Sequence, residues 1–215
     1  MLITANVGPL ATNQSLGNSG PGGTAVRLGN MGDLIVSELH GRYYEAAYRR
    51  SLFQVALQAA GTQTGGLIAT TVAFTGITLY NPIGSTVNLV INKASWALSA
   101  AATSASVVGI QGAYGVTAAT LTTPITTRNA YQGGAASVAQ AVSVGTFTFS
   151  PAAQIIDVFG SVGTAATTAF AEEPGSILDL EGSIIVPPAA LIALYFSGAQ
   201  TTNTWGGFSW EEVPV

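Results

Sequence analysis

The chain has 215 residues, six of them basic and ten acidic, and a formal net charge of −4 at pH 7. It contains no cysteine, which excludes disulfide scaffolds, thiol catalysis and cysteine-ligated zinc. Charged residues make up 7% of the chain, against about 25% in ordinary globular domains, whereas a monomer of this size would expose about 9,200 Å². So few charges on so large a surface predict a protein that packs against other copies or other proteins.

The shortage of basic residues argues against a nucleic-acid partner, because binding to phosphates depends on lysine and arginine. The first residues, MLITAN, lack both the basic and the apolar part of a signal peptide. The longest apolar run, 184–196, is broken by Pro187 and Pro188 and is shorter than the roughly 20 residues that a membrane helix needs. We therefore expect neither a nucleic acid nor a membrane as partner.

The first 30 residues are rich in Gly, Asn, Pro, Ser and Thr, and residues 17–23 read GNSGPGG. Such a segment cannot bury enough apolar surface to fold alone. It is either an arm that becomes ordered on a partner or a tail without a role. The glycines follow no predicted strand and have no acidic residue placed to bind a ribose, so they do not form a dinucleotide-binding motif.

Residues 27–50 hold four of the six basic residues. Two acid–arginine pairs stand four residues apart with the acid first, Glu38 with Arg42 and Glu45 with Arg49, which predicts a short helix near 42–50. Tyrosine and arginine are the residues favoured at the centre of interfaces. The alternative is a solvated helix with ordinary side-chain pairs. The predicted partner-binding residues are Arg27, Arg42, Tyr43, Tyr44, Tyr48, Arg49 and Arg50.

From Ser51 onward the chain is rich in Thr, Val, Ile and Gly and holds two basic and seven acidic side chains, which is typical of β structure. We expect a mainly β fold: a jelly-roll-like antiparallel β-sandwich at 51–215, preceded by an extended N-terminal arm with one short helix at 1–50. The predicted strands are 72–80, 86–99, 106–111, 116–121, 144–150, 154–159, 177–186, 191–197 and 205–213.

Local patterns add detail to several of these strands. The turn-like residues 81–85 predict a hairpin between the first two. The apolar positions change parity across Gly76, as they do across Gly145, and a glycine at such a switch is typical of a bulge. Leu178 and Leu180 are expected to face the core, with the acids between and after them facing solvent. Residues 191–196 are continuously apolar, which predicts a strand covered on both faces.

Candidates for chemistry are few, and we expect neither a cofactor nor a metal. His40 is the only histidine and Lys93 the only lysine; a structural histidine and an exposed strand lysine are the preferred interpretations. Asp179 and Glu181 should lie about 7 Å apart on one strand face, a separation that a glycan-cleaving carboxylate pair could use. An ordinary solvent-facing pair is the simpler alternative.

The aromatic residues Trp205, Phe208 and Trp210 gather near the end of the sequence. They could form a sugar-stacking platform or a subunit interface. Phe208 and Trp210 share one strand parity, so the simpler interpretation places them in the core.

The Asn/Gly-rich start, the turn LYNPIGS at 79–85 and the ending FSWEEVPV at 208–215 resemble small virion structural proteins of tailed bacteriophages, capsid cement or decoration proteins above all. The resemblance implies a jelly-roll-like domain, a homotrimer and attachment to the major capsid protein or another virion protein on the capsid surface, with no catalytic residue. Two other classes stay open: a receptor-binding spike or fibre head that binds host glycans, and a polysaccharide-degrading enzyme that uses paired acids.

Overall fold

The structure, a computed structural model, describes residues 41–163 and 175–215. Residues Tyr43–Val215 belong to one compact unit. In this unit the described residues form twelve strands and a single five-residue helix, so the mainly β prediction is confirmed. The predicted arm, residues 1–30, lies outside the described residues. The predicted helix is α1, Tyr44–Tyr48, and it belongs to the same compact unit as the strands.

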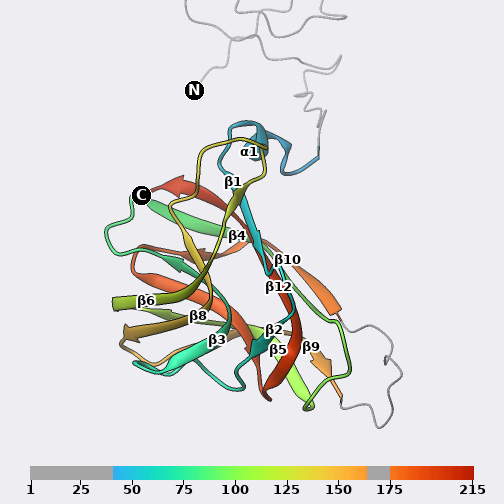
Figure 1. Ribbon diagram of the computed structural model, residues 1–215. Helices are drawn as coiled ribbons and strands as arrows, with labels where there is room; N and C mark the ends of the chain where they lie inside the picture. The colour runs from blue at the N-terminus through green and yellow to red at the C-terminus, as the bar shows by residue number, and fades with distance from the viewer. Residues whose placement is uncertain (1–40, 164–174) are drawn as a thin grey trace, which may run out of the picture. The chain divides into compact units, whose positions relative to one another are not determined.

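The strands form two antiparallel sheets (Figure 1). The first sheet has the order β10–β4–β12–β1–β7, and β2 also pairs with β12. Its strands are β10 (Gly175–Val186), β4 (Val87–Leu98), β12 (Gln200–Pro214), β1 (Leu52–Ala56), β7 (Arg128–Asn129) and β2 (Gly61–Gln63). The second sheet has the order β6–β8–β3–β11–β5–β9. Its strands are β6 (Val116–Ile125), β8 (Gln140–Phe149), β3 (Ala73–Asn81), β11 (Ala190–Phe196), β5 (Ser106–Tyr114) and β9 (Gln154–Val162).

Eight of these strands have the connectivity of a jelly roll. Taken in chain order, β1, β3, β4, β5, β9, β10, β11 and β12 alternate between the sheets except at β5 and β9, which pair directly. The first and last of the eight pair in one sheet, and the second and the seventh pair in the other. This is the double Greek-key winding of a jelly roll, as predicted. Strands β6 and β8 extend the second sheet beside β3.

The predicted hairpin between the first two strands is wrong, because β3 and β4 lie in different sheets. The link between them crosses the sandwich, and Asn81 closes this corner. Its Nδ2 donates to the carbonyl oxygens of Val87 (2.8 Å) and Val186 (3.0 Å), which belong to the other sheet. A turn-like sequence shows that the chain turns there, but it does not show which strand will pair with which.

The core lies between the sheets, and a second apolar cluster lies on the other face of the second sheet. The central strand β11 serves both, with Ile192, Leu194 and Phe196 in the first cluster and Leu191 and Ala193 in the second. This confirms the prediction of a strand covered on both faces. The core placement of two C-terminal aromatic residues is also confirmed, since Phe208 and Trp210 are 3% and 0% exposed.

The predicted bulge at Gly76 is present. The pairing of β3 with β8 shifts register between Thr75 and Thr78, and Gly76 has a φ of +146°. A Cβ atom at this position would collide with the side chain of Gln63. Glycine is therefore required both by the backbone conformation and by the close approach of β2.

Candidate interaction surface

Helix α1 is fixed to the end of the first sheet, where β1 begins (Figure 1). The Ser51 backbone N–H donates to the Ala46 carbonyl oxygen at 3.0 Å, and the Ser51 hydroxyl lies 3.0 Å from Glu211 Oε1 on β12. The backbone N–H of Glu212 donates to the Ser51 carbonyl oxygen at 2.9 Å. A helix of five residues has too few internal hydrogen bonds to persist alone, so these contacts with β12 stabilise it.

The outer side of α1 carries exposed aromatic and charged side chains. Tyr44 and Tyr48 are 44% and 64% exposed and stack with their ring centroids 5.9 Å apart. Arg49 Nε donates to Glu45 Oε1 at 2.7 Å, which confirms the predicted pair. Since both partners are exposed, this pair contributes only about 0.3–0.5 kcal/mol to stability.

Tyr43 has a different role from its neighbours, because it is half-buried against the outer face of the first sheet. Its hydroxyl donates to Asp179 Oδ1 at 2.9 Å, and Lys93 Nζ lies 5.2 Å from its ring centroid. These contacts bind the start of α1 to β10 and β4. Of the predicted partner-binding residues, Tyr43 thus has an evident structural role in positioning the helix.

Arg50 joins the helix to the loop that follows β7. Its guanidinium carbon lies 4.7 Å from the ring centroid of Tyr131, and its carbonyl oxygen accepts a hydrogen bond from Asn129 Nδ2 at 2.8 Å. The same loop is held to β12, because Glu212 Oε1 accepts hydrogen bonds from the Ser137 hydroxyl and from the backbone N–H of Val138. Tyr131 was not predicted from the sequence, since no local pattern links it to Arg50.

Four predicted residues and Tyr131 therefore share one exposed surface, which we call the helix surface: Tyr44, Tyr48, Arg49, Arg50 and Tyr131. Arg42 is exposed and immediately precedes Tyr43 in the chain. Arg27 lies outside the described residues. Tyr and Arg side chains that are exposed together on a fixed scaffold are suited to a protein interface.

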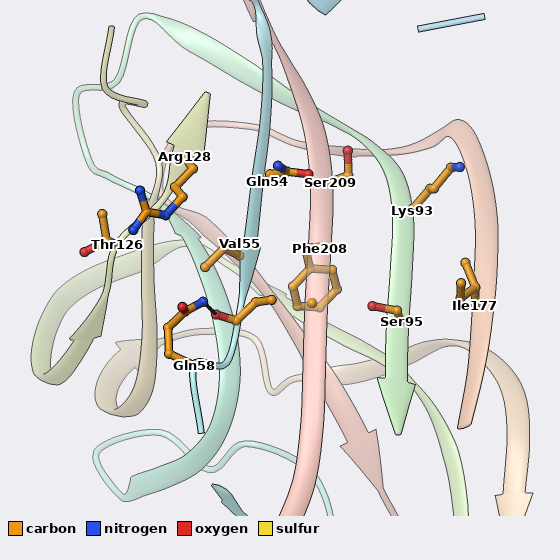
Figure 2. A pocket seen from close by; sticks show the side chains of 12 residues that line it. Gln54, Val55, Gln58, Lys93, Ser95, Thr126, Arg128, Ile177, Phe208 and Ser209 are labelled. Atoms are coloured by element: carbon orange, nitrogen blue, oxygen red, sulfur yellow. Dashed lines mark hydrogen bonds between the residues drawn. The ribbon is translucent and has the colours of Figure 1, made fainter. Parts of the chain in front are cut away.

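A second feature was not predicted from the sequence. The outer face of the first sheet has a groove of about 390 Å³, lined by residues from β10, β4, β12 and β1 and by the segment that enters β7 (Figure 2). Lys93 and Arg128, the only basic residues after Arg50, both line it. We call it the outer-face groove. Lys93 was predicted to be an exposed strand lysine; it lies on the outer face of the sheet but is half-buried, and the groove was not predicted.

The acidic residues considered for chemistry have structural contacts. Asp179 accepts from Tyr43, and β10 is irregular after Asp179, with Glu181 at a φ of +51°. Within the two described ranges, no three His, Cys, Asp or Glu side chains are grouped so that they could hold a metal ion. None of the helices in these ranges has the length and apolar character to span a membrane. His40 lies outside the described residues.

Comparison with models of known protein families, with curated proteins and with solved structures found no match.

Proposed function

We propose that the protein is a non-enzymatic virion structural protein that binds and stabilises a phage capsid shell, as capsid cement proteins do. The observation that carries the proposal is the helix surface, which presents three exposed tyrosines and two arginines at one end of a rigid jelly roll. In the chain, α1 comes after the segment predicted to be an arm. The arm and the helix surface would together bind neighbouring shell subunits.

The energetics of such binding require many weak contacts. Arginine guanidinium groups pair well with carboxylates, but each exposed pair contributes only about 0–1 kcal/mol. Tyrosines add apolar area with few torsions to restrain. Several copies acting together on a shell supply the remaining affinity, and a ligand that bridges subunits stabilises the assembled state that it binds.

We propose in addition that copies of the chain associate, as a homotrimer. Strands β9 and β10 are the edges of their sheets on the same side of the sandwich (Figure 1). They expose Ile155, Ile156, Val158 and Ile177 to the extent of 44%, 48%, 52% and 72%. Soluble proteins usually protect edge strands with charges, bulges or covering segments. An apolar edge of this kind supports burial between copies.

The test uses shells of the source virus that lack this protein, mixed with the full chain or with variants. We expect the Arg49→Ala, Arg50→Ala double variant and a chain without residues 1–30 each to bind fewer copies per shell and to protect shells less against heat. Arg128→Ala, which removes a basic residue far from α1 in the sequence, is the matched control and should bind normally. Parent-like binding and protection by both test variants would refute the proposed mode of attachment.

A second candidate function, a receptor-binding head, is favoured by the outer-face groove. A head domain needs a recessed site for a host ligand, and the groove provides one on a face that the helix surface does not use.

A further inference from the structure

The outer-face groove contains both basic residues found after Arg50 in a chain with very few charges. Arg128 is exposed and its backbone pairs with Gln54 of β1, but neither a hydrogen bond nor an ion pair joins its side chain to any part of the chain that the structure describes. Lys93 is half-buried, with the Tyr43 ring above it and Asp179 opposite it on β10. Arg128 is thus the basic side chain that a ligand can bind without displacing a partner.

Polar side chains connect the two basic residues in a straight row across the sheet. Lys93 pairs with Ser209, Ser209 with Gln54, and Gln54 with Arg128, on β4, β12, β1 and β7. Figure 2 shows Arg128 and Lys93 at opposite sides of the groove with Gln54 and Ser209 between them. Three strand spacings separate the two basic residues by about 14 Å at the backbone. This length matches two to three sugar rings or a few extended residues.

The next row of outward residues forms the floor, and its side chains are small. Ser95, Gly207 and Ala56 are aligned by strand pairing, and the exposed Ile177 stands at the end of this row on β10. Two positions before Gly207 on the same face of β12, Trp205 is 36% exposed. The groove therefore combines a shallow floor and a row of polar groups, and an indole ring lies in the next outward row along β12, outside the lining.

We infer that the outer-face groove binds an acidic oligosaccharide, a chain of sugars that carries carboxylates as uronic or sialic acids do. The Arg128 guanidinium would hold one carboxylate through two parallel hydrogen bonds. The Gln54 amide and the Ser209 hydroxyl both donate and accept hydrogen bonds, as sugar hydroxyl groups require. Trp205 offers an apolar ring on which the C–H face of a sugar can pack. This inference does not depend on the proposed binding to a shell.

An acidic peptide is the other ligand that such charges could attract, and the position of the groove disfavours it. Extended peptides gain affinity when they add a strand to a free sheet edge. The groove lies instead on the face of the sheet, where β4, β12 and β1 have strand partners on both sides. A peptide would have to leave its own backbone groups without this pairing, whereas a sugar binds through side-chain groups alone.

The experiment measures binding of the full chain to α-1,4-linked tri-galacturonic acid by calorimetry and by ligand-detected NMR. The methyl ester of the same trimer, 3′-sialyllactose, lactose and hexaglutamate are the comparison ligands. Among the variants, Arg128→Gln removes the carboxylate-binding group, Ala56→Tyr fills the floor at an exposed position, and Arg49→Gln makes the same change of charge on α1. The thermal melts of all the variants are recorded to show that each is folded.

We expect the tri-acid or sialyllactose to bind more tightly than its neutral counterpart, with an affinity that falls as salt is added. Arg128→Gln should weaken binding by about tenfold or more, the usual effect of losing a charge-assisted contact. Ala56→Tyr should abolish it and Arg49→Gln should leave it unchanged. The relative affinities of the tri-acid and sialyllactose show which kind of acidic sugar is preferred.

Four results would overturn the inference: equal binding of acidic and neutral sugars, equal weakening by Arg128→Gln and Arg49→Gln, tighter binding of hexaglutamate than of either acidic sugar, or no binding of any sugar. The failure of shell binding is distinguishable from these results. Arg128→Gln should decorate shells normally, while the Arg49→Ala, Arg50→Ala variant should bind sugar normally.

Discussion

Trp210 allows a sharp test of how the core is stabilised, because two substitutions there should have very different effects. The side chain is fully buried and stacks on Phe53, with the ring centroids 6.1 Å apart. Its indole Nε1 is buried, and the described residues offer it no hydrogen-bond partner. Trp210→Ala leaves a cavity and loses the ring pair, so we expect a loss of about 3–4 kcal/mol in the free energy of unfolding.

Trp210→Phe keeps a ring against Phe53 and removes the unpaired N–H. The smaller ring loses apolar burial worth about 1.5–2 kcal/mol, while removal of a buried unpaired donor recovers about 1–3 kcal/mol. The two effects nearly cancel, and the variant should lie within about 1 kcal/mol of the parent. Trp205→Phe, on the exposed outer face, is the control and should change stability by no more than about 0.5 kcal/mol.

The assay is urea unfolding followed by circular dichroism at one fixed protein concentration, because self-association would change the apparent stability. The slopes of the transitions should agree among the variants, so that midpoints report stability. A loss from Trp210→Phe as large as that from Trp210→Ala would refute the reasoning. The indole N–H would then be satisfied in solution, for example by a buried water molecule.

Three further predictions follow from particular contacts. Gly76→Ala should lower the unfolding free energy by about 2 kcal/mol or more, because the new side chain meets an unfavourable φ and collides with Gln63. The control is Gly84→Ala, where φ is also positive but the space is open, and its loss of unfolding free energy in the same urea titration should be smaller. Ile156→Lys on β9 should reduce the sedimentation coefficient if the edge strands associate, and an unchanged value would show that this edge is not the interface. Glu212→Ala should lower the unfolding free energy by about 1–2 kcal/mol and speed hydrogen exchange at the Val138 amide, because the Glu212 carboxylate accepts the hydrogen bond from that N–H. Exchange at the parent rate would show that other contacts hold the loop.

The parts of the fold that depend on local pattern could be predicted from the sequence. The alternation of Leu178 and Leu180 with acids, the apolar run in β11 and the Glu45–Arg49 spacing each have a local physical cause, and each appears in the structure. Strands β2 and β7 have three and two residues, too few for an alternating pattern. Strand β1 had such a pattern in its buried residues Phe53 and Val55, and the prediction missed it.

The arrangement of the site depended on pairing between distant segments, which local pattern does not encode. The sequence placed Tyr43 with the helix but did not show that its hydroxyl would reach Asp179, 136 positions later. Lys93 and Arg128 enter one groove only because β12 and β1 lie between β4 and β7. The turn after β3 was recognised, yet the partners of β3 and β4 are set by the whole winding of the chain.

The position of β12 has a consequence for how the protein is made. This strand is the last of the strands along the chain, yet it lies between β4 and β1, and Leu52 pairs with Glu211. During synthesis, β1 therefore emerges from the ribosome long before β12 exists, and the edges of β1 and β4 that β12 will join stay unpaired until then. Pairings so distant in sequence form slowly, and the waiting edges can pair with those of other nascent chains. Where many ribosomes translate one message, these unfinished sheets are close together, so their collision competes with the correct closure of each molecule.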